Sequence, residues 1–120
     1  MAKIILIGVE QAAAGQICRV LAVDRHHIEQ RPPDISIGVL GDADIVFAGG
    51  DPTHYLPLLK RVRETRPTLP FVVVTRTAET KEWLDAIEAG ATDYCSAPIE
   101  KRQLHWLMEA TRNWPSAATA

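Results

Sequence analysis

The sequence predicts an α/β domain in which a doubly wound parallel sheet of five strands carries helices on both faces. Short apolar runs, typical of strands buried on both faces, alternate with longer segments whose apolar residues recur every three or four positions. Strands that alternate with helices need crossover connections, and these connections build parallel sheets. A length of 120 residues suits one such domain.

The chain begins with a strong strand, a helix and a weaker strand. Ile4–Ile7 is a continuous apolar run, and Glu10–Leu21 carries a helical stripe of apolar residues. His26–Glu29 predicts a second strand. We expect Pro32 to end this segment, because proline has no N–H group to donate to a sheet.

The middle of the chain predicts a short helix, a buried strand and a longer helix. Asp34 is expected to cap the short helix over Ile35–Leu40, and Asp44–Ala48 is the third predicted strand. The longer helix is expected to have Thr53 as its cap, which would place Pro57 early, where a missing N–H is tolerated. Its apolar face consists of Tyr55, Leu58, Leu59 and Val62.

Two further strands and two helices complete the prediction. Phe71–Val74 is a buried strand rich in valine, and Thr92–Cys95 is the fifth strand. Between them, Glu79–Ala89 is expected to form a helix that ends before Gly90, since glycine commonly follows the last helical residue. Glu100–Asn113 is the last predicted helix.

Composition limits the possible functions. A net charge of −2 provides no basic surface for nucleic acid or an anionic membrane. No apolar run approaches the ~20 residues that cross a bilayer, and the start of the chain lacks a signal-peptide pattern, so we expect a cytoplasmic protein.

Cys18, Cys95 and the scattered histidines lack metal-ligand spacing. Residues 1–113 are the expected domain, and residues 114–120 are a flexible tail or the start of a linker.

Ligands of open parallel sheets bind beyond the carboxyl ends of the strands. A nucleotide site there needs closely spaced glycines after the first strand, but six residues separate Gly8 from Gly15, and neither G-x-G-x-x-G nor G-x-x-x-x-G-K occurs. The candidate pocket residues at the strand ends are therefore few. They are Gly8, Val9, Glu10, Gly49, Asp51, Thr75 and Ala97.

The segment Ala86–Tyr94 resembles the A-x-x-A-G-A-x-D-Y stretch of the receiver domains of bacterial two-component response regulators. The resemblance in order and spacing covers nearly the whole chain. It implies a flavodoxin-like topology with strand order 2-1-3-4-5. It also implies that Thr75 stands at the position of the family's switch hydroxyl and Tyr94 at that of its switch aromatic residue.

The resemblance places other residues where the family carries its phosphotransfer groups. The family's acidic pair falls on Gly8 and Val9, with Glu10 beyond them, its phosphoacceptor aspartate on Gly49, and its lysine on Ala97. Mg²⁺ needs oxygen ligands, a phosphoryl group needs a nucleophile, and its charge needs a cation. The chain is therefore identified as a degenerate receiver domain, for which we expect no aspartyl phosphorylation, no catalysis, no metal and no cofactor.

Other interpretations of the same residues remain open. Asp51 is either a displaced phosphoacceptor or the start of the next helix, since Asp before Pro commonly begins a turn. In a second alternative, the crevice at the strand ends belongs to a small-molecule sensor or an enzyme. Glu10, Asp51 and Thr75 would then supply the polar groups.

Aromatic residues near the end of the chain predict a protein interface. Trp106 lies off the inner face of the last helix, and Trp83 lies near the start of the preceding one. Large aromatic residues often anchor interfaces, although Trp106 packed across a neighbouring helix is the alternative. The family uses the last two helices and the fifth strand for dimerisation or output. Trp83, Tyr94 and Trp106 are therefore expected to bind a signalling protein, an output protein or a second copy of the chain.

Overall fold

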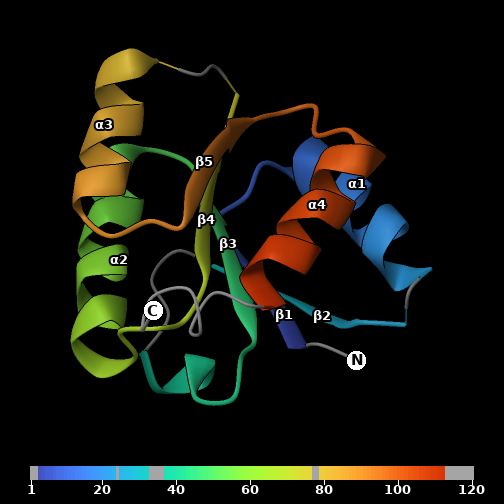
Figure 1. Cartoon of the computed structure of the whole chain (residues 1–120), viewed down its shortest axis with the longest axis horizontal. Coiled ribbons are helices and arrows are strands. Elements are labelled where there is room, and N and C mark those ends of the chain that lie inside the picture. The colour runs from blue at the N-terminus through green and yellow to red at the C-terminus, as the bar shows by residue number, and fades with distance from the viewer. Residues whose placement is uncertain (1–2, 24, 33–36, 77–78, 113–120) are drawn as a thin grey trace.

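In the computed structural model, five parallel strands form one sheet in the order β2-β1-β3-β4-β5, which confirms the predicted class and strand order. The structure describes residues 3–23, 25–32, 37–76 and 79–112. Figure 1 shows α2 and α3 on one side of the sheet and α1 and α4 on the other. The elements are β1 (Lys3–Ile7), α1 (Gln11–Ala22), β2 (His27–Arg31), the 3-10 helix η1 (Ile37–Leu40), β3 (Ile45–Gly49), α2 (Pro52–Thr65), β4 (Phe71–Thr75), α3 (Thr80–Glu88), β5 (Asp93–Ser96) and α4 (Lys101–Arg112).

The sheet separates two hydrophobic clusters, because successive side chains of a strand point to opposite faces. In β1, Ile5 and Ile7 belong to the cluster beneath α2 and α3, whereas Ile4 and Leu6 belong to the cluster beneath α1 and α4. The central strands are buried on both faces and therefore appear in the sequence as continuous apolar runs.

Several predicted boundaries are wrong by a few residues, and one predicted cap is the wrong residue. The strand β2 runs from His27 to Arg31 and so extends to the residue before Pro32. Asp51, and not Thr53, caps α2, and Pro52 occupies the first helical turn. Pro57 consequently lies inside the helix. The predicted cap Asp34 and residues 114–120 lie outside the described residues.

Two arginines near the end of α2 connect loops that are distant in sequence. The Arg63 guanidinium donates to the carbonyl oxygens of Gly90 at 2.8 Å and Leu69 at 2.6 Å. Arg66 donates through Nη1 to the carbonyl oxygens of Leu40 and Ala43, both at 2.8 Å. These bonds satisfy carbonyl groups in the turns that lead into β3, β4 and β5.

Gly90 is required beside Arg63 for two reasons. Its φ of +109° lies in a region that side chains disfavour, and a Cβ atom there would lie 3.1 Å from Cγ and Nε of Arg63. The turn after α3 is therefore closed by a glycine backbone packed directly against a half-buried guanidinium.

Replacing Arg63 by methionine tests this connection. We expect Arg63→Met to lower the free energy of unfolding by about 2 kcal/mol, because the loss of a charged donor leaves carbonyl groups unpaired. Urea unfolding monitored by circular dichroism gives the value. Lys60→Met, an exposed change on the same helix, is the control and is expected to have little effect. Equal stabilities of the two variants would contradict the proposed role of Arg63.

None of the described helices has the length and apolar character needed to span a membrane.

Candidate functional site

The carboxyl ends of the strands surround a crevice of about 470 Å³. This is where an open parallel sheet places its ligands. The structure brings together five of the pocket residues predicted from the sequence. Gly8, Glu10, Asp51, Thr75 and Ala97 line the crevice.

Gly49, at the end of β3, is buried and has no space for a side chain. A Cβ atom there would lie 2.7 Å from the carbonyl oxygen of Val74 and 3.1 Å from the Cα atom of Val9. Both neighbours are backbone atoms of adjacent segments, so relief requires a movement of the main chain. The backbone therefore leaves no room at residue 49 for the first atom of a side chain.

Neither Gly8 nor Val9, on which the family's acidic pair falls, offers a side-chain oxygen. Gly8 has a φ of +62°, a left-handed conformation that favours glycine, and Val9 packs against the hydrophobic cluster beneath α1 and α4. Among the described residues, no group of three His, Cys, Asp or Glu side chains has an arrangement that could hold a metal ion.

Two carboxylates at the rim of the crevice, those of Glu10 and Asp51, have structural partners. Glu10 forms an ion pair with Arg76, with 3.0 Å between Oε2 and Nε. Asp51 accepts hydrogen bonds from the backbone N–H of Thr53 at 2.8 Å and from its hydroxyl at 2.9 Å. These bonds keep the pKa of Asp51 below its ordinary value. Asp51 thus caps a helix, as the alternative interpretation of Asp before Pro predicts.

A chain of polar side chains crosses the crevice wall from β4 to α3. The hydroxyl of Thr75 donates to that of Tyr94 at 3.4 Å, and the Tyr94 hydroxyl donates to Oε2 of Glu82 at 3.2 Å. Tyr94 is only 7% exposed and points inward. It therefore adds little to any interface, and Trp83 and Trp106 are the exposed members of the predicted set.

Sequence analysis did not identify Glu82 or Arg76 as part of the site. Glu82 follows no motif, and only its position on α3, one turn from the end that faces the crevice, brings it to Tyr94. Helical spacing, which places Glu82 and Ala86 on the same side of the helix, is the signal that would have suggested a role for Glu82. Arg76 directly follows Thr75 and pairs with Glu10 only because β1 and β4 end on the same edge of the sheet.

The cysteines do not provide reactive groups at this edge. Cys18 and Cys95 are both free. Burial raises the pKa of the Cys95 thiol to about 12, so the thiol is protonated at neutral pH. Cys95 accordingly acts as a small buried hydrophobic residue.

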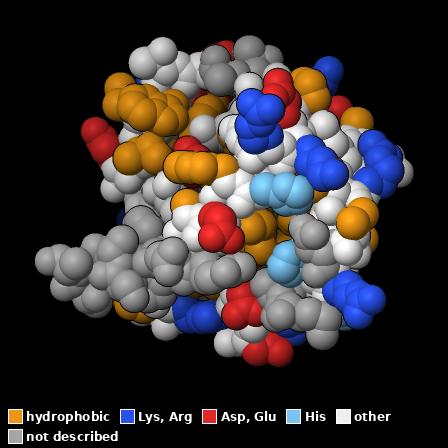
Figure 2. All heavy atoms as spheres, turned by 45° about the vertical axis from the view of Figure 1, so that its right-hand side comes forward, with side chains coloured by type: hydrophobic (Ala, Val, Ile, Leu, Met, Phe, Trp, Pro, Cys, Tyr) orange, Lys and Arg blue, Asp and Glu red, His pale blue; other side chains and the backbone are white. Residues whose placement is uncertain are grey.

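Three large apolar side chains of α3 are exposed. Trp83, Leu84 and Ile87 are 44%, 45% and 37% exposed, whereas Ala86 is the buried residue of this helix. On α4, Trp106 is 61% exposed. Figure 2 shows that hydrophobic side chains gather over one part of the face it presents, while charges of both signs are spread over the rest.

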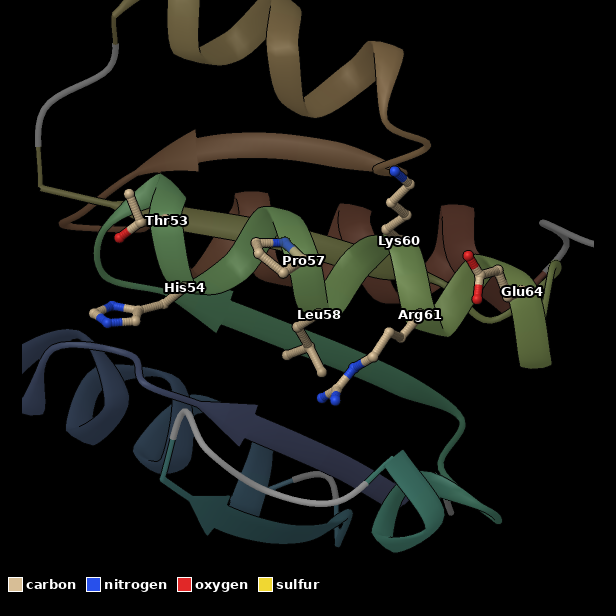
Figure 3. A pocket seen from close by; sticks show the side chains of 7 residues that line it. All are labelled: Thr53, His54, Pro57, Leu58, Lys60, Arg61 and Glu64. Atoms are coloured by element: carbon tan, nitrogen blue, oxygen red, sulfur yellow. The ribbon is translucent and has the colours of Figure 1, made fainter.

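A wider hollow of about 660 Å³ runs along α2, away from the predicted residues. Figure 3 shows that the side chains lining it come from this one helix and extend to both of its sides. They carry charges of both signs and form no cluster with evident chemistry. They are Thr53, His54, Pro57, Leu58, Lys60, Arg61 and Glu64.

The strand order and the crevice at the strand ends define a doubly wound, flavodoxin-like α/β protein. Within that class the chain has the fold of response regulator receiver domains. A receiver domain from Clostridium thermocellum superposes with a TM-score of 0.83 at 17% identity, covering 98% of this chain and 99% of that one. A two-component response regulator from Clostridium difficile gives 0.81 at 21% identity, covering 94% and 97%.

One further comparison is with the structure of an orphan regulator, and another is with the sequence of a bacterial protein. HP1043, an orphan response regulator of H. pylori, gives a TM-score of 0.73 at 20% identity, covering 92% of this chain and 95% of that one. Protein PetR of Rhodobacter capsulatus is 35% identical over 78 residues, which cover 64% of this chain but only 31% of PetR. No family model matches the sequence.

A substitution at Gly49 tests whether the backbone fills this position. We expect Gly49→Ala to lower the free energy of unfolding by about 2 kcal/mol or more, because the new methyl group overlaps main-chain atoms. Gly15→Ala in α1 is the matched control, since the nearest atom to its added Cβ lies at 3.6 Å. Chemical denaturation of both variants should show a stable control and a destabilised Gly49 variant. A Gly49→Ala variant as stable as the wild type would contradict this prediction, because it would show that the backbone around residue 49 moves apart at little cost.

Proposed function

We propose that the chain is a receiver-like signal transduction module that acts by protein contact, without aspartyl phosphorylation and without catalysis of its own. The likeness in fold to response regulator receiver domains over at least nine-tenths of the chain supports the signalling role. Such a module would act in the cytoplasm, where response regulators meet their partners.

The observation that carries the proposal is the absence of space at Gly49. Phosphoryl transfer to a protein needs a nucleophile that projects into a pocket with groups able to hold the phosphoryl charge. Here the acceptor position is closed by the backbone of the neighbouring strands, and Ala97 offers no cation. Asp51, the carboxylate two residues beyond Gly49, is engaged as the cap of α2.

The exposed residues of α3 and α4 support the protein-contact part of the proposal. Trp83 and Trp106 are large aromatic residues of the kind that anchor interfaces. The exposed side chains of α3 include the negatively charged Asp85 and Glu88. Those at the start of α4 include the positively charged Lys101 and Arg102. Such a surface is complementary to a second copy of itself, because two-fold symmetry would bring α3 of one chain toward α4 of the other.

Treatment with a small acyl phosphate donor and Mg²⁺ tests the absence of phosphorylation. We expect the intact mass of the wild-type chain to remain unchanged, and the same for Asp51→Asn. A receiver domain with an intact acceptor aspartate serves as the positive control. Gain of one phosphoryl group by the wild type, and its loss in Asp51→Asn, would contradict the proposal and favour a displaced acceptor.

Sedimentation velocity over a range of protein concentrations tests the interface. We expect Trp106→Asp and Trp83→Asp to weaken self-association at least tenfold, because each change introduces a charge into an apolar contact. Val23→Asp alters an exposed apolar residue at the end of α1 and is the control. A wild-type chain that remains monomeric at every concentration would contradict self-association.

A further inference from the structure

The helix α3 is attached to the domain by few apolar contacts. It has nine residues, and Ala86 is the one whose side chain is buried. A helix this short is not stable in isolation, and most helices are positioned by burial of an apolar face. Because Trp83, Leu84 and Ile87 each leave more than a third of their surface exposed, apolar burial holds α3 only in part, and polar contacts contribute to its position.

The two ends of α3 are attached in different ways. At the C-terminal end, the backbone N–H of Ala91 donates to the carbonyl oxygen of Ala86 at 3.0 Å, and Arg63 holds Gly90. Toward the N-terminal end, the described contact to the sheet is the hydrogen bond from Tyr94 to Glu82. Since Tyr94 also contacts Thr75, this bond joins α3 to both β4 and β5.

A second buried tyrosine hydroxyl, that of Tyr55, lies near Tyr94. The neighbouring hydroxyl of Tyr55, which is 2% exposed, has no hydrogen-bond partner among the described residues. A tyrosine hydroxyl can both donate and accept, yet Tyr94 is bonded to Glu82 and not to this unpartnered hydroxyl. Burial, followed by the proximity of Tyr94 and Glu82, raises the pKa of Tyr55 to about 12. The carboxylate of Glu82 is thus the acceptor that the Tyr94 hydroxyl has found.

We propose that Glu82 is a phosphate-independent clamp that keeps Tyr94 turned inward and thereby fixes α3, with its apolar outer surface, in one position. The bond is long for a hydroxyl and a carboxylate, at 3.2 Å, but partial burial limits competition by water. The clamp rests on the proposed function, in which the chain is not phosphorylated. The hydrogen bond from Tyr94 to Glu82 would hold α3 in place without phosphorylation. Without the clamp, Tyr94 loses its acceptor and the N-terminal half of α3 loses its described polar connection to the sheet.

Hydrogen–deuterium exchange with mass spectrometry tests the clamp on the intact chain. We expect backbone amides in a peptide covering α3 to exchange about tenfold faster in Glu82→Ala and in Tyr94→Phe than in wild type. Glu88→Ala removes an exposed carboxylate of the same helix, and Tyr55→Phe removes the unpartnered hydroxyl. Both controls should exchange like the wild type.

Two additional measurements make the result specific. The double variant Glu82→Ala, Tyr94→Phe should exchange no faster than either single variant, because the two residues act through one bond. Glu82→Gln, which keeps an acceptor oxygen but removes the charge, should give an intermediate rate. Amides of β1 and β3 should remain protected in all variants, which reports an intact sheet.

The clamp would be overturned if α3 exchanged equally in wild type, Glu82→Ala and Glu88→Ala, or if the effects of Glu82→Ala and Tyr94→Phe were additive. The measurement requires neither a phosphate donor nor a partner. Its failure is therefore separate from failure of the proposed function, which the intact-mass experiment decides.

Discussion

The close approach of three segments of backbone at Gly49 is the constraint on which the rest of the site depends. In this strand order β3 lies between β1 and β4, so the end of β3 is flanked by main chain on both sides. With Val74 O only 2.7 Å from the position of a Cβ atom, the end of β3 is closed by backbone, and Gly49 does not line the crevice. The polar side chains of the crevice, among them Glu10, Asp51 and Glu82, consequently come from the segments that surround the end of β3.

At the rim, polar groups neutralise and orient one another. Glu10 pairs with Arg76, Asp51 accepts from the first turn of α2, and Glu82 accepts from Tyr94. A group that already has a partner must give it up before it can bind a ligand, which costs binding free energy. The polar residues of the crevice therefore serve the connections between elements. This use of carboxylates agrees with a module whose surface, and not whose pocket, contacts other molecules.

The sequence predicted the elements because their signals are local, and it missed contacts that depend on distance or direction. Phe71–Val74 is apolar throughout since both faces of β4 are buried, and the third strand was correctly found to end near Gly49. Helical periodicity correctly predicts a helix over Glu79–Ala89, but it cannot tell which side of the helix meets the sheet. The hydrogen bond from Arg63 to Gly90 spans 27 residues and leaves no local pattern.

The exposed apolar surface of α3 and the clamp beneath it have the same physical origin. A helix that directs Trp83, Leu84 and Ile87 outward gives up the burial that would ordinarily hold it against the sheet. Polar contacts then contribute more to the position of the helix. Glu82 makes such a contact, because its carboxylate accepts a hydrogen bond from Tyr94 on the inner side of the same helix. An apolar face held in one position loses less conformational entropy when a partner covers it. Rigid attachment through the core and an uncovered hydrophobic exterior would thus both serve the proposed protein-contact surface.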